Sequence, residues 1–157
     1  EDLTLLVKCL RLRRGYAISP TTVTPGGDGR PRVFIMNDSA GQSSVEGDTT
    51  FRGGGVWIFA DGAAETFWSN VAWTPEQLTK HSTETEMANA TCSLAALVVT
   101  YPGFDFVEVL DSQAAVHTLR RLACRSASLE RQVLYRLEVL QSLPPGTRVW
   151  TVWSTLP

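Results

Sequence analysis

The sequence is poor in the features that mark metal–thiolate sites, disulfide frameworks and membrane spans. Its three cysteines, Cys9, Cys92 and Cys124, lie far apart and form no CxxC pair. This spacing argues against a zinc site and against a dense disulfide framework, so a reducing compartment is expected. No apolar run approaches the roughly 20 residues of a membrane span, and the acidic start does not resemble a signal peptide. We therefore expect an intracellular protein with no membrane partner.

An excess of charge of either sign is also missing. The 14 basic and 16 acidic side chains give a formal net charge of −2, so nucleic-acid binding would depend on a local basic patch. A chain of 157 residues, 43% of them hydrophobic, is long enough for one buried core and too short for two ordinary domains. Because the first residue is Glu1 and not methionine, we expect a processed product or a piece of a longer polypeptide.

The chain divides at a segment rich in proline and glycine. Residues 19–32 have a composition that cannot build the interior of a helix or strand, which predicts a loop or linker. We therefore expect an N-terminal arm and linker over residues 1–32 and one folded domain over residues 33–157.

Hydrophobic periodicity in the domain predicts three strands followed by alternating helices and strands. The three strands are expected at 33–38, 56–60 and 64–73, with a hairpin around Asp61 and Gly62. The remaining elements are a short turn or helical turn at 74–77, helices at 83–99, 114–124 and 126–143, and strands at 104–110 and 148–153. Ser128 is the candidate cap of the last helix. The order βββαβααβ predicts an α/β (α+β) fold in which a three-strand antiparallel meander is extended by parallel strands, with helices packed on the mixed sheet.

Three acidic residues stand where such sheets place their sites. Asp38 ends the first strand, Asp111 ends the fourth, and Glu86 lies near the start of the first long helix. Ligands gather outside the carboxyl ends of parallel strands, so the three carboxylates would converge if the first and fourth strands are neighbours. Converging carboxylates favour hard cations such as Mg²⁺ or Mn²⁺. Two such ions about 4 Å apart can activate water for phosphodiester cleavage.

The same residues resemble motifs of the ribonuclease H superfamily, above all of the domains attached to retroelement and viral reverse transcriptases. The motifs that carry the resemblance are Phe34-Ile35-Met36-Asn37-Asp38-Ser39, Gly53-Gly54-Gly55-Val56, Glu86-Met87-Ala88-Asn89-Ala90, Leu110-Asp111-Ser112 and Val149-Trp150-Thr151-Val152-Trp153. The Asp-Ser motif at 111–112 is the most specific of them.

The resemblance implies a ribonuclease H-like fold and a metal-dependent endonuclease that hydrolyses the RNA strand of RNA/DNA hybrids. Asp38, Glu86 and Asp111 would be catalytic and would hold two Mg²⁺ or Mn²⁺ ions. Substrate contacts are expected from four further residues, Ser39, Ser112, Arg120 and Arg121. A preceding reverse transcriptase or connection domain in the parent polypeptide would be the protein partner.

Two departures from the family pattern keep a second hypothesis open. The family's Asp-Gly-Ser is here Asp38-Ser39-Ala40, and its fourth carboxylate, on a helix after the last strand, is not visible before Pro157. Neither His81 nor His117 aligns with the family's histidine loop. The alternative is therefore a catalytically weak or inactive scaffold or nucleic-acid-binding module, and a transposase, integrase or exonuclease of the same superfamily is a third possibility.

Simpler explanations exist for each residue taken alone. An aspartate at a strand end is often a turn or helix cap, and Glu84 competes with Glu86 for the helix position. A basic cluster in and between the last two helices could contact a phosphate backbone, form an ordinary solvated helix face or contact a neighbouring domain; it consists of Arg120, Arg121, Arg125, Arg131 and Arg136. Tryptophans 57, 150 and 153 are expected in the core, whereas Trp68 or Trp73 could stack on a base or a partner.

Overall fold

The computed structural model describes residues 29–40, 52–63 and 66–154. The predicted N-terminal arm lies almost entirely outside these residues. The helices and strands are β1 (Arg32–Ala40), β2 (Gly53–Ala60), β3 (Phe67–Ala72), α2 (Pro75–Leu78), α3 (Ser82–Thr100), β4 (Asp105–Leu110), α4 (Gln113–Arg121), α5 (Ala127–Gln141) and β5 (Val149–Trp153). The predicted order of elements is confirmed, and the expected turn after the third strand is the short helix α2.

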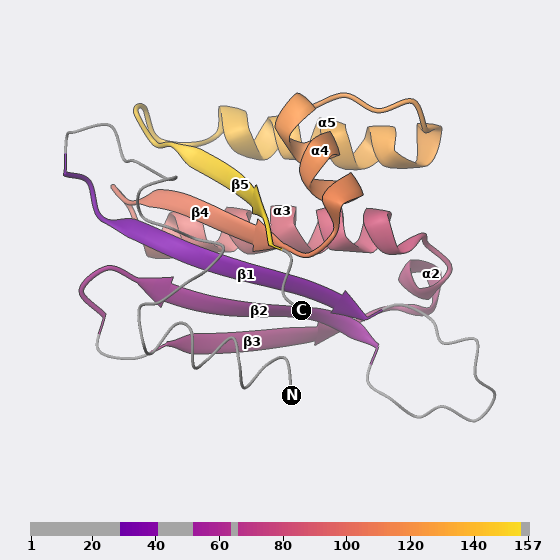
Figure 1. Cartoon of the computed structure of the whole chain (residues 1–157), viewed down its shortest axis with the longest axis horizontal. Coiled ribbons are helices and arrows are strands. Elements are labelled where there is room, and N and C mark those ends of the chain that lie inside the picture. Colours follow the sequence, from indigo (N-terminus) through magenta and orange to yellow (C-terminus); the bar gives the residue numbers. More distant parts are fainter. Residues whose placement is uncertain (1–28, 41–51, 64–65, 155–157) are drawn as a thin grey trace.

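The strands form one mixed sheet in the order β3-β2-β1-β4-β5 (Figure 1). The β1–β2 and β2–β3 pairs are antiparallel, and β4 is parallel to both β1 and β5. β1 and β4 are therefore direct neighbours that point the same way, as the convergence of Asp38 and Asp111 requires. The predicted mixed α/β sheet is confirmed.

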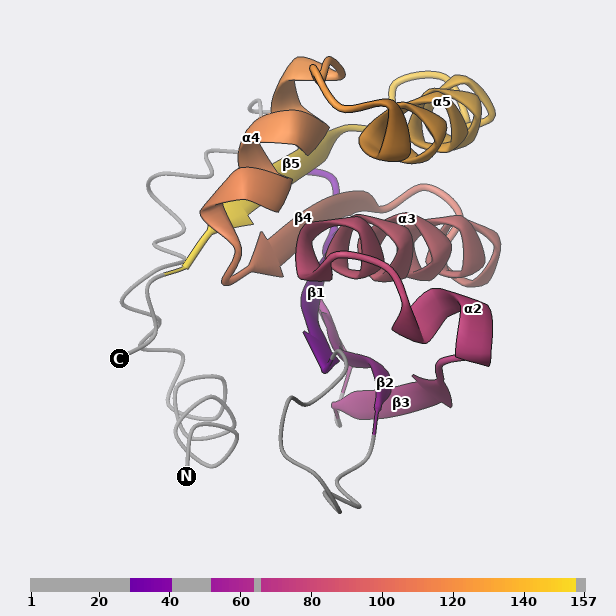
Figure 2. The same cartoon turned by 90° about the vertical axis from the view of Figure 1, so that its right-hand side faces the viewer.

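Helices α3 and α5 lie side by side over one face of the sheet, and α4 packs near β5 (Figure 2). β4 is buried along its whole length, because it lies in the interior of the sheet under these helices. The main core joins β1, β4, α3 and α5 through apolar side chains such as Ile35, Leu94, Phe106 and Val139. Among the described residues, none of the helices is long and apolar enough to cross a membrane.

Helix ends explain one wrong sequence prediction. α5 begins after Ser126, which is its N-cap residue, and Ser128 lies inside the first turn. The two hydroxyls contact each other at 2.9 Å, and Ser126 makes no side-chain cap bond. The prediction that Ser128 caps the helix was wrong because serine is common on both sides of a helix start, and local sequence does not separate the two.

A buried ion pair joins α5 to the middle of the sheet. Glu108 of β4 and Arg136 of α5 are both almost completely inaccessible, and the guanidinium binds the carboxylate through two nitrogens, one of them at 2.9 Å. The Thr151 hydroxyl donates to the same carboxylate at 3.0 Å. Arg136 therefore belongs to the core, and its predicted place on a phosphate-binding helix face was wrong.

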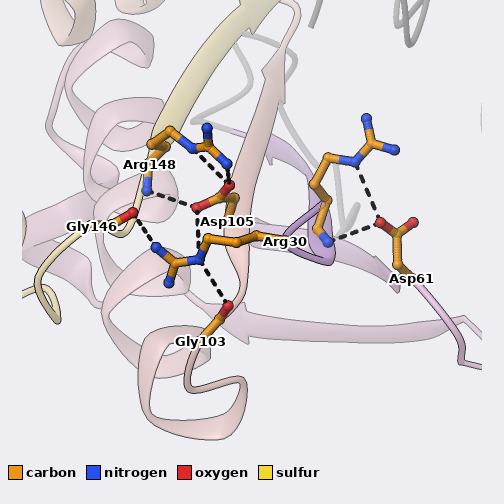
Figure 3. A network of polar contacts seen from close by, with 7 residues as sticks. Arg30, Asp61, Gly103, Asp105, Gly146 and Arg148 are labelled. Atoms are coloured by element: carbon orange, nitrogen blue, oxygen red, sulfur yellow. Dashed lines mark hydrogen bonds and ion pairs between the residues drawn. The ribbon is translucent and has the colours of Figure 1, made fainter. Parts of the chain in front are cut away.

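A second polar network braces the end of the sheet where β4 begins (Figure 3). Asp105 is fully buried and accepts hydrogen bonds from the backbone nitrogen and Nε of Arg148, at 3.0 and 2.8 Å. Arg30 lies 3.8 Å from the same carboxylate and donates from Nε to the Gly103 carbonyl at 3.2 Å. Asp61 accepts from the Arg32 backbone at 2.9 Å. These contacts tie the loops at this end of the sheet together.

Candidate active site

Asp38 lies near the carboxyl end of β1. This is the end of the sheet opposite to the network of Asp105, Arg148 and Arg30. Its carboxylate accepts a 2.7 Å hydrogen bond from the backbone nitrogen of Ser39. The Ser39 hydroxyl donates to the Thr85 hydroxyl at 2.8 Å, and Thr85 is in the first turn of α3. Ser39, predicted as a substrate contact, therefore also joins the end of β1 to the helix that carries Glu86.

Asn89 is a second link between α3 and this end of the sheet. Its Nδ2 donates to the carbonyls of Asp38 at 3.0 Å and Gly55 at 2.9 Å. The approach is possible because residue 54 is glycine, since a Cβ there would lie 2.3 Å from the Asn89 Oδ1. Asn89 thus holds the backbone behind the Asp38 carboxylate. Sequence reasoning quoted Asn89 only as part of a motif, although a polar residue between the buried Met87 and Ala90 is a usable signal.

Glu86 lies in the first half of α3, is partly buried, and is close enough to Asp38 and Asp111 for both charges to act on it. The pKa of Glu86 is raised from 4.5 to about 7, chiefly because the side chain is partly buried and also because of the charges of Asp111 and Asp38, while an interaction with the Ser112 side chain opposes the rise. Oε2 of Glu86 is buried and has no hydrogen-bond partner among the described residues. Burial, and next the charge of Asp38, also raise the pKa of Asp111. The three carboxylates therefore act on one another electrostatically.

Two residues fix the loop that carries Asp111. Ser112 is the N-cap of α4, and its Oγ accepts from the Ala115 backbone at 3.2 Å. The same side chain also lowers the pKa of Glu86, so Ser112 lies near the acid that α3 carries. The Trp153 indole donates from Nε1 to the Asp111 carbonyl at 3.1 Å. Trp153 is 41% exposed, so the prediction that it lies in the core was wrong.

The competing acid on the helix has a different environment. Glu84 is buried and forms an ion pair with Lys80, with the two atoms 3.6 Å apart. Within the described part of the chain, no lysine or arginine pairs with Asp38, Glu86 or Asp111. Because the charges of both aspartates act on Glu86, it is the better candidate for the third acid of the site.

The donor chemistry of the three acids fits a hard divalent cation, because carboxylate oxygens are the ligands that Mg²⁺ and Mn²⁺ prefer. In residues 29–40, 52–63 and 66–154, no group of three or more His, Cys, Asp or Glu side chains is arranged so that it could hold a metal ion. Ion binding would therefore have to draw the three side chains closer together. The buried, unpartnered Glu86 oxygen is a ready acceptor in such a rearrangement.

The other predicted residues lie farther from the acids. Arg120 and Arg121 are exposed in the last turn of α4, a helix of nine residues, and so about 13 Å along its axis from Ser112. Arg120 donates from Nε to the Thr151 carbonyl at 2.6 Å. His81 is the N-cap of α3, where its Nδ1 accepts from the Thr83 backbone, and His117 is exposed on α4.

Comparison of the structure with solved proteins identifies the fold. The N-terminal ribonuclease H domain of a Mycobacterium tuberculosis protein, solved as a fusion with maltose-binding protein, superposes with a TM-score of 0.57 at 13% identity, over 80% of this chain and 88% of that one. The chain has the ribonuclease H fold. This confirms the fold that the motifs implied.

Two further structures have the same fold in different contexts. A ribonuclease H1 isolated from compost, solved in complex with an RNA/DNA hybrid, gives a TM-score of 0.50 at 9% identity, with coverage of 77% of this chain and 85% of that chain. The protease-reverse transcriptase of prototype foamy virus gives 0.54 at 10% identity and covers 99% of this chain, which spans only 18% of that protein. No family profile matches the sequence, and no curated protein sequence matches it.

Proposed function

We propose that this chain is a metal-dependent endonuclease domain that hydrolyses the RNA strand of RNA/DNA hybrids as part of a reverse transcriptase polyprotein. The observation that carries the proposal is the position of Glu86, whose carboxyl group lies partly buried within the electrostatic reach of both Asp38 and Asp111. Three mutually repelling acids without a basic partner among the described residues need another source of positive charge, which a bound cation supplies.

Fold similarity supports the choice of substrate. One of the similar structures holds an RNA/DNA hybrid, and another is a reverse transcriptase. Asp38 and Asp111 lie at the carboxyl ends of the parallel strands β1 and β4, where open α/β sheets bind their ligands.

Each residue has a distinct role in the proposal. Asp38 and Asp111 hold two Mg²⁺ or Mn²⁺ ions, and Glu86 is a ligand to one of them. Bound as a pair, such ions supply an activated water and stabilise the leaving oxygen. Ser39 and Asn89 keep Asp38 in place, and Ser112 and Trp153 keep Asp111 in place. Arg120 and Arg121 contact the phosphate backbone of the hybrid.

The test is cleavage of a hybrid with a labelled RNA strand in the presence of Mg²⁺. We expect Asp38→Asn and Asp111→Asn each to lower the rate by more than about a hundredfold, since even the outer partners of metal ligands contribute 10–100-fold. Glu76→Gln, which removes an exposed acid on α2, is the matched control and should cleave like the parent chain. Equal rates in parent and Asp38→Asn would contradict the assignment of the site.

A calorimetric titration with Mn²⁺ separates the catalytic proposal from its rival. Heat of binding in the parent chain and none in Asp38→Asn supports the metal site independently of cleavage. A chain that binds hybrid but neither takes up the ion nor cleaves would instead be the nucleic-acid-binding scaffold, the alternative that the sequence left open.

A further inference from the structure

The two edges of the sheet are protected to very different degrees. β5 forms one edge. There Nε of Arg120 donates a hydrogen bond to the Thr151 carbonyl, and α4 packs against the strand. β3 forms the other edge, and all six of its residues are exposed (Figure 1). Within the described residues, no strand pairs with the outer side of β3.

β3 also has an unusual composition for an open edge. Phe67, Trp68 and Val71 are 53%, 63% and 54% exposed, and residues 66–73 contain neither a charged side chain nor a proline. Natural edge strands are usually protected by lysines, prolines or bulges, because unpaired backbone groups otherwise recruit another strand. Trp68 continues an aromatic surface that begins at Trp57 of β2, with the two rings 6.3 Å apart. This combination is typical of an edge that pairs in the functional state.

We propose that β3 is the dimerisation edge of this domain and that its partner is β3 of a second copy of the chain, paired antiparallel around a two-fold axis. The lack of charge favours a second copy, because in such a pair a charged residue would lie close to its own copy and be repelled. Self-pairing also uses up the open edge in both molecules, so assembly stops at two copies.

The register follows from the alternation of side chains. In a continuous sheet, residues opposite each other lie on the same face, so a residue near the middle of β3 must lie on the axis opposite itself. With Ser69 on the axis, Phe67 of one copy lies opposite Val71 of the other, and the pair occurs twice. This register joins two of the most exposed apolar side chains in an aromatic and β-branched pair, a favourable cross-strand combination.

Sedimentation velocity of the 157-residue chain over a concentration series tests the proposal. The parent chain is expected to convert from monomer to dimer as its concentration rises. In Phe67→Lys/Val71→Lys each lysine lies opposite a lysine of the second copy, and we expect the dissociation constant to rise on the order of tenfold or more. Val99→Lys is the matched control, because Val99 is an 82% exposed apolar residue on α3, and it should dimerise like the parent.

The outcomes separate cleanly. A parent chain that stays monomeric at every concentration overturns the proposal, as does a dimer that the double variant leaves unchanged. If the double variant loses its cooperative thermal transition, Trp68→Lys/Asn70→Lys on the opposite face of the strand replaces it with the same expectation, because in this register residue 68 of one copy lies opposite residue 70 of the other. Hybrid cleavage is measured in parallel, and a dimer without cleavage supports the β3 edge while counting against the proposed function.

Discussion

The two ends of strand β4 carry the same residue type in opposite surroundings. Asp105, at its start, is fully buried and bound by Arg148, with Arg30 close by. Asp111, just after its end, is exposed, lies near Glu86 and within reach of the charge of Asp38, and no described lysine or arginine pairs with it. Between them Glu108 is paired inside the core with Arg136. Among the described residues, the acids that hold the fold together are thus paired with arginines, and those of the candidate site are not.

The largest effect on stability is expected from the Glu108–Arg136 ion pair in the middle of β4. Arg136→Met leaves the Glu108 carboxylate buried without its cation, and we expect the free energy of unfolding to fall by about 3 to 5 kcal/mol. Urea denaturation measures the loss. Arg131→Met on the exposed side of the same helix is the control and should change stability by less than about 0.5 kcal/mol. Equal free energies of unfolding for Arg136→Met and Arg131→Met would contradict the structural role of Glu108.

The next effect is expected at the braced end. Asp105→Asn removes the charge that Arg148 and Arg30 face, and we expect a loss of about 2 to 3 kcal/mol, less than for the core pair because the Arg148 side chain is partly exposed. Asp111→Asn, the same substitution at the other end of β4, should leave stability unchanged or raise it, since it relieves repulsion from Asp38. Similar losses in the two variants would remove the distinction between the ends.

The smallest effect concerns Glu86 of the candidate site and the pH dependence of the free energy of unfolding. Because the pKa of Glu86 is raised to about 7 in the folded chain, the native state holds a proton that the unfolded chain releases near pH 4.5. This residue therefore favours folding at low pH, and its contribution falls as the pH rises from 4.5 to 7. Glu86→Gln should be more stable than the parent by about 1 to 2 kcal/mol above pH 7, after allowing for solvent screening, and the gain should shrink below pH 5.

Thermal unfolding at pH 5 and pH 8 without divalent ions measures this difference. The same scans with Mn²⁺ should narrow the gap at pH 8, because the ion stabilises only the chain that keeps the Glu86 carboxylate. A Glu86→Gln variant that is less stable than the parent at pH 8 would contradict the environment assigned to this residue.

The helices and strands could be predicted from the sequence, whereas the surroundings of single side chains such as Arg136 and Trp153 could not. Periodicity predicted the strands and helices because each element repeats one local rule over several residues, as in α3 and in the fully buried β4. It misplaced Arg136, since an arginine on a helix is usually solvated and only the packing of α5 over Glu108 makes it a core residue. Trp153 was likewise expected in the core. Its indole instead donates a hydrogen bond to the Asp111 carbonyl, a contact between residues 42 positions apart that no local pattern indicates.

The sequence by itself determined the order of the elements and the mixed sheet, because periodicity is a local property, and position at element ends made the acids at 38, 86 and 111 the candidates for the site. Only the tertiary structure decided which acids pair with arginines of the described residues, that Asn89 fits against Gly54 behind Asp38, and that the Arg120 side chain bonds to one sheet edge while every residue of β3 at the other edge is exposed. These features depend on contacts between residues that are distant in the chain. Such contacts determine the burial of a side chain and the charges around it, and a local sequence pattern does not contain them.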